Sequence, residues 1–351
     1  MTNEIPGAGP VRAGHAFDET ALARRLESTI PGFHGPLSVN QFDGGQSNPT
    51  FHLRSAGGDY VLRKRPPGKL LPSAHAIDRE YRVMKALADS DVPVPRMLAY
   101  CDDDSVIGTA FYVMDYVPGR ILTDPLLPGM PPAERAAIYD AMNDTLARLH
   151  RFDWRAAGLA DYGRPENYLA RQLARWAKQY DATRTEDVPA MDRLRGWLEA
   201  NMPADEEPTI AHGDFRIGNL VFHPTEPRVL AILDWELSTL GAPLGDLAFN
   251  CMTYHLPAGH RISGGFVGAD TAALGIPDET SYLDAYCRRT GRDAIPAWRY
   301  YMAFSLYRTA AIQQGVYARA LQGNASSSFA KAFGESWRMV AETGWALVAA
   351  D

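Results

Sequence analysis

The periodicity of the sequence changes near residue 118, and this change constrains the fold more than any other feature. Upstream, short β-like runs are separated by turns rich in glycine and proline, at 38–42, 50–55, 60–64, 96–100 and 109–113. Downstream, helical patterns prevail, at 133–152, 167–180 and 189–201, with a β-loop-β segment at 209–233 and further helices to the end. Grouped strands followed by grouped helices predict an α+β fold, not the alternation of a parallel nucleotide-binding sheet.

The same change predicts two domains, 1–117 and 118–351. The first would contain the sheet, one main helix at 73–88, and an N-terminal helix at 17–31 that Asp18 caps. The second would be mostly helical. The turn-rich stretch that opens at Pro118-Gly119 is the expected hinge, and 351 residues suffice for two such lobes.

Composition narrows the class of protein. The chain is 46% hydrophobic and 22% charged, as in ordinary globular proteins, and its net charge of -7 gives no reason to expect nucleic acid or an anionic membrane as a partner. No apolar run approaches the roughly 20 residues of a membrane helix, and the first residues lack a signal-peptide pattern. Cys101, Cys251 and Cys287 are widely spaced, which favours a reducing compartment over a disulfide framework or zinc site. We therefore expect a cytoplasmic protein, and no protein partner is implied.

The residues with the clearest chemistry form the octet His212-Gly-Asp-Phe-Arg-Ile-Gly-Asn219, followed after an apolar run at 229–233 by Asp234-Trp-Glu236. Phosphoryl transfer needs a carboxylate that accepts the proton of the attacking hydroxyl, and oxygen ligands that hold Mg²⁺. Asp214 and Asn219 lie at opposite ends of one short loop, and the apolar run would present Asp234 rigidly. A polar surface turn between two strands would explain the octet alone, but not the Asp-Trp-Glu that follows it.

This pattern resembles the catalytic loop and the metal-binding aspartate of the protein-kinase-like superfamily. It looks most like the aminoglycoside phosphotransferase and choline kinase branch, in which HGD replaces HRD and an Asp-x-Glu replaces DFG. The resemblance implies a bilobed kinase-like fold, ATP and Mg²⁺ as cofactors, Asp214 as the catalytic residue, and Asn219 and Asp234 as metal ligands. His212 and Asp246 would support the catalytic loop structurally.

The motifs that predict nucleotide binding are less specific than the octet. Gly44-Gly-Gln-Ser-Asn48 resembles the phosphate loop of small-molecule kinases, although a hairpin turn is the plainer interpretation. Strand 60–64 resembles the strand whose basic residue pairs the phosphates. Strand alternation puts Arg63 and Lys64 on opposite faces, and the family pattern that this strand resembles places the basic residue at Arg63, unless a bulge shifts the register. A solvated basic edge strand is the alternative.

Two further segments complete this side. Glu80 resembles the glutamate that forms an ion pair with that basic residue, and 111–119 resembles the hinge, whose backbone and apolar side chains bind adenine. The resemblance thus implies nucleotide-binding roles for Gly44, Gly45, Ser47, Asn48, Arg63, Lys64, Glu80, Met114, Asp115 and Tyr116.

The acceptor is suggested by a narrower resemblance. GGQSNPTF, YVLRKRPPG, HGDFRIGNL and ILDWELSTLGAPLGDLA look like the phosphotransferase domain that is fused to some acyl-CoA dehydrogenases, which implies phosphorylation of a hydroxyacyl-CoA. After residue 280 basic residues outnumber acidic ones, which suits an anionic small-molecule substrate such as a CoA thioester, although these arginines could simply be solvated. A kinase for another small alcohol (an antibiotic, choline, homoserine or a sugar) is an alternative. A nucleotide-binding pseudokinase is another, but the filled catalytic positions argue against it.

Overall fold

The computed structural model describes residues 5, 7–43, 48–66, 76–204, 207–260, 262, 264–321 and 329–349. The chain divides into two compact units, Met1–Gly119 with Leu230–Glu236, and Arg120–Val229 with Leu237–Asp351. The first is built on a β-sheet and the second is mostly helical, as the predicted α+β fold requires. Residues 230–236 belong with the first unit, which sequence patterns did not predict; there the Ile232 N–H donates to the Pro93 carbonyl at 2.9 Å.

Among its described residues, the sheet lobe contains six strands in the order β1-β2-β3-β4-β6-β5, each antiparallel to its neighbours. Their bounds are β1 Ala8–Gly9, β2 Ser38–Phe42, β3 Thr50–Ser55, β4 Gly58–Lys64, β5 Met97–Cys101 and β6 Phe111–Asp115. Strand β4 pairs with β6 so that Val61 lies opposite Met114 and Arg63 opposite Tyr112. This register decides which side chains share a face of the sheet.

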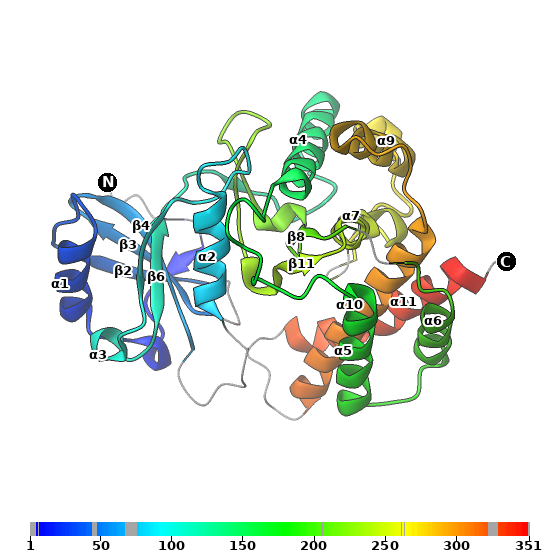
Figure 1. Ribbon diagram of the computed structural model, residues 1–351, viewed down its shortest axis with the longest axis horizontal. Helices are drawn as coiled ribbons and strands as arrows, with labels where there is room; N and C mark the ends of the chain where they lie inside the picture. The colour runs from blue at the N-terminus through cyan, green and yellow to red at the C-terminus, as the bar shows by residue number, and fades with distance from the viewer. Residues whose placement is uncertain are drawn as a thin grey trace. The chain divides into compact units, whose positions relative to one another are not determined.

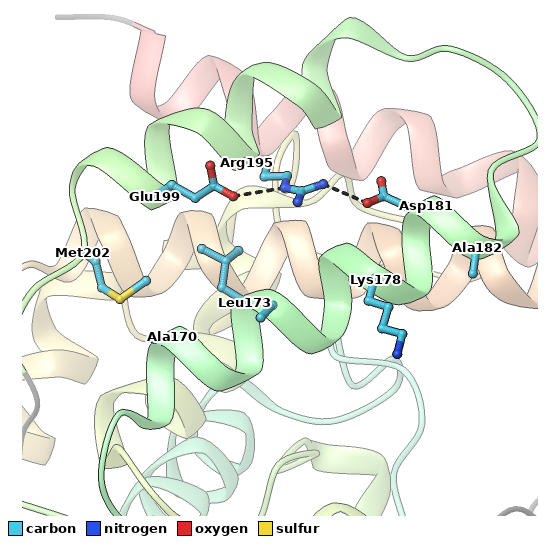
Figure 2. A pocket seen from close by; sticks show the side chains of 9 residues that line it. Ala170, Leu173, Lys178, Asp181, Ala182, Arg195, Glu199 and Met202 are labelled. Carbon is cyan, nitrogen blue, oxygen red and sulfur yellow. Dashed lines mark hydrogen bonds and ion pairs between the residues drawn. The ribbon is translucent and has the colours of Figure 1, made fainter.

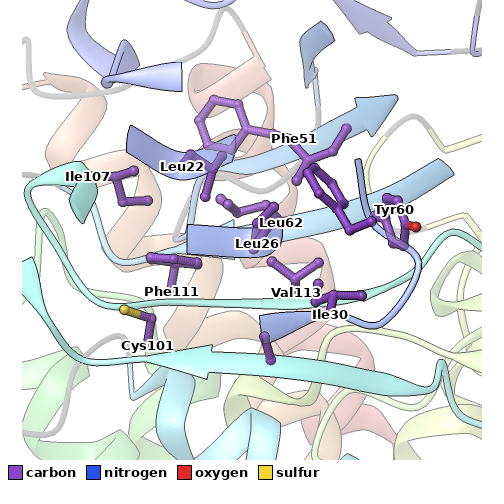
Figure 3. Packing of buried hydrophobic residues seen from close by; sticks show 13 residues of the cluster. Leu22, Leu26, Ile30, Phe51, Tyr60, Leu62, Cys101, Ile107, Phe111 and Val113 are labelled. Carbon is purple, nitrogen blue, oxygen red and sulfur yellow. The ribbon is translucent and has the colours of Figure 1, made fainter. Parts of the chain in front are cut away.

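One face of this sheet is covered by helix α1, Glu19–Thr29. Asp18 caps the helix as predicted, because its carboxylate accepts the N–H groups of Thr20 and Ala21, both at 2.9 Å. The buried side chains of the helix and the sheet form one apolar cluster, which also includes Ile107 of α3, Asp104–Ile107 (Figure 3). Its members include Leu22, Leu26, Ile30, Phe51, Leu62, Phe111 and Val113.

Helix α2, Ile77–Leu87, packs on β5 and β6. A helix was predicted at 73–88, and the described helix begins at Ile77. Residues 73–75 lie outside the described part of the chain. Glu80 is buried on α2, and the residues it contacts, Arg63 and Tyr112, alternate along β4 and β6 with the Leu62 and Val113 of the apolar cluster. Because successive side chains of a strand point to opposite faces, α1 and α2 cover opposite faces of the sheet.

The helical lobe is organised around helix α10, Trp298–Leu321, most of whose side chains between 300 and 315 are buried. Four helices pack against it: α5 Tyr168–Thr183, α6 Pro189–Ala200, α7 Pro243–Cys251 and α11 Phe329–Ala349 (Figure 1). Helices α4 Pro132–Arg151 and α9 Glu279–Thr290 pack on each other. Across the described residues, no helix combines the length and the apolar character needed to cross a membrane.

Short strands in this lobe carry the loop of interest. Strand β8, Thr209–Ala211, pairs with β11, Thr239–Gly241, and β7, Arg120–Ile121, pairs with β9, Leu220–Phe222. The octet 212–219 thus connects the end of β8 to the start of β9, and its last residues form a single 3₁₀ turn, Ile217–Asn219. The predicted β-loop-β segment is present, and it positions the loop from both ends.

Candidate active site

The loop between β8 and β9 holds Asp214 and Asn219 together. The Asn219 side-chain amide donates to the Asp214 carboxylate at 2.8 Å and to the Asp214 backbone carbonyl at 2.9 Å. Arg216, which the sequence reading passed over, lies 3.5 Å from the same carboxylate, which is 23% exposed. Asp214 therefore keeps an accessible, oriented carboxylate that can accept a proton.

Asp246 of α7 supports this loop from beneath. Its buried carboxylate accepts the backbone N–H groups of His212 and Gly213, the latter at 2.8 Å. Burial alone raises the pKa of Asp246, but its hydrogen bond to His150 and the nearby histidines outweigh that effect and hold the pKa below the usual range. His212 has no exposed surface, and its Nδ1 accepts the Asp214 N–H at 3.2 Å.

Gly213 occupies a position that only glycine fits. Its φ is +84°, and a Cβ at this position would lie 2.8 Å from the Leu237 carbonyl oxygen and 3.0 Å from the Leu237 Cβ. A side chain here would be strained and would also collide with backbone. The glycine of the HGD motif is therefore required by the path of the loop.

In the sheet lobe, the Arg63 guanidinium contacts three carboxylates. Its Nε lies 3.1 Å from Glu80 Oε2, and its Nη2 lies 2.8 Å from Asp234 and 3.4 Å from Glu236. Burial lowers the pKa of Arg63, but the carboxylates, with Glu80 the strongest, more than compensate and raise it. Arg63 therefore remains a cation beside Asp234.

Glu80 is buried and is held by two neutral donors. The Tyr112 hydroxyl donates to it at 3.0 Å and the Asn48 amide at 2.9 Å. Burial raises the pKa of Glu80, and Arg63 opposes this effect. Asn48, predicted to approach phosphate, is fully buried beside Glu80 and supports the ion pair from within. Tyr112 was missed, although alternation places it on the same face as Met114, which was predicted.

Lys64 lies on the other face of the sheet, because β4 keeps a continuous register with β3 and β6. Its ammonium lies 5.2 Å from the ring centroid of Phe17 and 5.7 Å from that of Phe51, and burial lowers its pKa. The inclusion of Lys64 with the phosphate-binding residues is thus corrected, since its side chain packs in the α1 face. Gly44, Gly45 and Ser47 lie outside the described residues.

Asp234 follows β10, Val229–Ile232, in an uncommon backbone conformation. Its φ is +66°, in the left-handed region that aspartate tolerates better than most residues. The next residue, Trp235, anchors the turn because its indole N–H donates to the Ile232 carbonyl at 3.0 Å. The carboxylate of Asp234 is 35% exposed while it pairs with Arg63.

The donor atoms of this chain fit Mg²⁺ by their chemistry. The Asp234 carboxylate is a hard oxygen ligand, and the Asn219 amide directs its nitrogen to Asp214, which leaves its oxygen for a cation. Within the described ranges, no group of three or more His, Cys, Asp and Glu side chains could hold a metal ion. Mg²⁺ usually takes only one or two protein carboxylates and completes its shell with water and phosphate oxygens, so this sparse set is appropriate.

Of the predicted hinge residues, Met114 and Asp115 end β6 and Tyr116 follows it. Met114 is buried, on the Arg63 face of the sheet. The Asp115 N–H donates to the Arg96 carbonyl at 3.0 Å and the Tyr116 N–H to the Asp59 carbonyl at 3.3 Å. Because those two N–H groups are already used within the sheet lobe, an adenine would have to be bound by other backbone groups of this segment.

A groove of about 630 Å³ lies on the helical lobe between α5 and α6 (Figure 2). Ala170, Leu173 and Met202 line its apolar part, and Arg195 bridges Asp181 and Glu199 along it, at 3.0 and 3.1 Å. None of the predicted site residues lines this groove, and these three charged groups pair with one another. It is separate from the loop that carries Asp214.

A sheet lobe with a buried Arg–Glu ion pair beside an aspartate, and a helical lobe with an Asp–Asn loop braced by a buried aspartate, define a kinase-like phosphotransferase. The chain belongs to the phosphotransferase enzyme family, whose model matches residues 38–301. This membership confirms the predicted phosphotransferase class, and the predicted bilobed kinase-like fold is also confirmed.

The chain is also similar to particular members of this family and to longer proteins. A solved structure of a putative aminoglycoside phosphotransferase from Ralstonia eutropha is 52% identical, with a TM-score of 0.86 over 95% of this chain and 98% of that one. Acyl-CoA dehydrogenase family member 10 of mouse and member 11 of chicken are each 49% identical over 97% of this chain. The chain spans only 32% and 44% of their respective lengths. Choline kinase of Cryptosporidium parvum, 13% identical with a TM-score of 0.67, shares the fold.

Proposed function

We propose that this protein transfers the γ-phosphoryl group of ATP to a hydroxyl of a hydroxyacyl-CoA, with Mg²⁺ as the metal. The observation that carries the phosphoryl-transfer part is the Asp214 carboxylate, oriented by Asn219 and mounted on a loop that Asp246 braces. This is the arrangement that a general base for an attacking hydroxyl needs.

In the proposed reaction the acceptor oxygen forms a bond to the γ-phosphorus while the bond from that phosphorus to the ADP oxygen breaks. The hydroxyl proton passes to the Asp214 carboxylate. Asn219 and Asp234 would hold Mg²⁺, which would supply charge neutralisation at the phosphates. Arg63, kept in place by Glu80, would move from Asp234 to the phosphates, and Met114 would contribute apolar contact with adenine.

The glycine-rich loop completes the proposed nucleotide site. Backbone N–H groups of Gly44, Gly45 and Ser47 would approach the phosphates, since glycine lets the backbone come close. This part of the proposal rests on the motif and on its position between β2 and β3. Lys64 is left out of it because its side chain packs with Phe17 and Phe51.

The acceptor class rests on similarity to relatives named as acyl-CoA dehydrogenase family members, in which this chain corresponds to one part of a longer protein. The surplus of arginines after residue 280 gives it less support than expected. Arg289 pairs with Asp140 at 2.7 Å, Arg338 contacts Glu186, and Arg308 is buried in the helical lobe. These three are occupied within the protein, so a CoA phosphate would need other cations.

The test compares ADP release with acyl-CoA thioesters that do and do not carry a hydroxyl. We expect turnover with hydroxyacyl-CoAs of at least one chain length and none with the matched acyl-CoAs, with Mg²⁺ required and Asp214→Asn inactive. Rising salt should increase the KM for the thioester, since exposed charge pairs are screened over about 8–10 Å. An equal ADP release from both thioesters would contradict the acceptor proposal.

An aminoglycoside acceptor is the second candidate. It is favoured by the 52% identity to a protein described as a putative aminoglycoside phosphotransferase. A panel of aminoglycosides and choline belongs in the same assay. Turnover of an aminoglycoside together with no turnover of any acyl-CoA would replace the acceptor class and leave the phosphoryl transfer by Asp214 in place.

A further inference from the structure

Arg308 of α10 reaches the catalytic loop from behind. It is 8% exposed, and its Nη2 donates a hydrogen bond to the carbonyl of Gly213. That carbonyl belongs to the peptide group that joins Gly213 to Asp214. A buried cation is therefore hydrogen-bonded to the peptide group directly before Asp214, the residue to which we assign the proton transfer.

The guanidinium makes cation–π contacts with two aromatic rings. It lies 5.4 Å from the ring centroid of Trp176 on α5 and 5.3 Å from that of Phe249 on α7. No carboxylate forms an ion pair with Arg308 among the residues that the structure describes. Burial of a cation without an ionic partner is costly, so the two rings and the Gly213 carbonyl are the contacts that compensate.

Gly213 explains why such a contact is needed. Glycine is the most flexible residue, and its two flanking peptide groups can rotate unless each is held. Its N–H, in the peptide group before it, donates to Asp246 at 2.8 Å, and its carbonyl, in the peptide group after it, accepts from Arg308. Asp246 fixes only the first of these groups. The second is held at both of its polar atoms, since its Asp214 N–H donates to His212 Nδ1 at 3.2 Å and its carbonyl accepts from Arg308.

We propose that Arg308 is a positioning residue that sets the orientation of the Gly213–Asp214 peptide group and so the direction of the Asp214 carboxylate. The proposal rests on the proposed role of Asp214 as the base. Loss of the contact lets the carboxylate turn away from the acceptor hydroxyl, while the sheet lobe, with Arg63 and Glu80, is untouched. The effect therefore falls on turnover and spares nucleotide affinity.

The experiment measures kcat, both KM values, nucleotide affinity and thermal unfolding for Arg308→Ala and Arg308→Lys. We expect kcat of Arg308→Ala to fall about 10- to 100-fold, the scale of a misplaced catalytic group, with nucleotide affinity within about twofold of wild type. Arg308→Lys keeps the charge and can still donate a hydrogen bond, but it lacks the planar guanidinium, so its kcat should fall in between. Added guanidinium ion at low millimolar concentration should restore part of the kcat of Arg308→Ala by filling the space between Trp176 and Phe249.

Two controls separate positioning from stability. Arg289→Ala removes an arginine of α9 that pairs with Asp140 and Asn143, away from the loop, and should keep its kcat. Asp214→Asn with added guanidinium should stay inactive, since the base itself is missing. If Asp214→Asn were active, the proposed function would fail, whatever Arg308 does.

The results that would overturn the positioning role are equally specific. One is a folded Arg308→Ala with wild-type kcat. The other is a drop in kcat matched by an equal loss of nucleotide affinity, without rescue by guanidinium. If Arg308→Ala proves insoluble, the kcat of Arg308→Lys decides, because a wild-type value there would show that the planar guanidinium is not needed.

Discussion

Arg63 of β4 and Glu80 of α2 form a buried ion pair, with Nε and Oε2 3.1 Å apart. Tyr112 and Asn48 donate to Glu80, and Asp234 and Glu236 contact the other end of the guanidinium. The pair thus joins a strand, a helix and the turn after β10 within the sheet lobe. Its disruption should affect whatever binds beside Asp234.

Substitution of Arg63 should mainly affect nucleotide binding or turnover, whereas substitution of its neighbour Lys64 should mainly affect stability. Arg63→Ala removes the cation and leaves Glu80 buried without its ionic partner, so nucleotide affinity or turnover should fall by about tenfold or more. Lys64→Ala removes a side chain that packs on Phe17 and Phe51, so it should lower the unfolding temperature while nucleotide affinity changes little. Calorimetric titration with an ATP analogue and a thermal melt distinguish the two. A greater loss of affinity in Lys64→Ala would reverse our assignment.

The two aspartates should fail in different ways. Asp214→Ala should lower kcat by about two to four orders of magnitude and leave Mg-nucleotide affinity nearly intact, because the carboxylate acts on the acceptor proton. Asp234→Asn, which keeps a side chain that tolerates the left-handed backbone, should weaken Mg-nucleotide binding itself. Single-turnover kinetics together with nucleotide binding at several Mg²⁺ concentrations make the comparison. An equal loss of nucleotide affinity in both variants would contradict this division of roles.

Gly213→Ala should distort the catalytic loop without removing any functional side chain. The added methyl would meet the Leu237 carbonyl at 2.8 Å, in a backbone conformation with a φ of +84°. We expect a loss of roughly 1–3 kcal/mol in the free energy of unfolding and a larger proportional loss of kcat, because Asp214 is the next residue. Urea denaturation and steady-state kinetics test this. Gly196→Ala, at an exposed position of α6 with open space where its Cβ would lie, is the matched control and should keep wild-type activity.

His150 should make stability depend on pH. Burial lowers its pKa below the ordinary value, although the hydrogen bond to Asp246 partly opposes this. The unfolded chain then binds the proton first, so stability conferred by neutral His150 is complete above about pH 6.5 and is lost as the pH falls below that value. The slope can reach about 1.4 kcal/mol per pH unit. Urea unfolding between pH 7.5 and 5 should show a shallower decline for His150→Gln, and an unchanged slope would exclude His150 as its source.

Patterns within one element were predictable from the sequence. Alternation along β4 predicted that Arg63 and Lys64 point to opposite faces, and the family pattern assigned Arg63 to the face that carries Glu80. The cap at Asp18 and the strands around Arg63 follow from local residue preferences. Element ends were less accurate, since β6 runs from Phe111 to Asp115 instead of from 109 to 113.

Contacts between distant parts of the chain were not predictable. Arg308 is separated from Gly213 by 95 positions, and nothing in the pattern of α10 distinguishes it from a solvated arginine. The backbone N–H groups of Asp115 and Tyr116 are occupied because Arg96 and Asp59 happen to lie alongside, which depends on the sheet order. Asn48 likewise turns toward Glu80 only because β3 and α2 are brought together.

The register of β4 places Leu62 in the apolar cluster and Arg63 at the ion pair, on consecutive residues. A deletion of one residue in the turn at 56–57 would exchange their faces, which would bury the guanidinium among hydrocarbons and place leucine beside the carboxylates. We therefore expect this single deletion to make the protein both insoluble and inactive. We therefore expect β4 and its turn to tolerate no change in length, natural or engineered. The connection between α5 and α6 can change length without altering which faces Leu62 and Arg63 occupy.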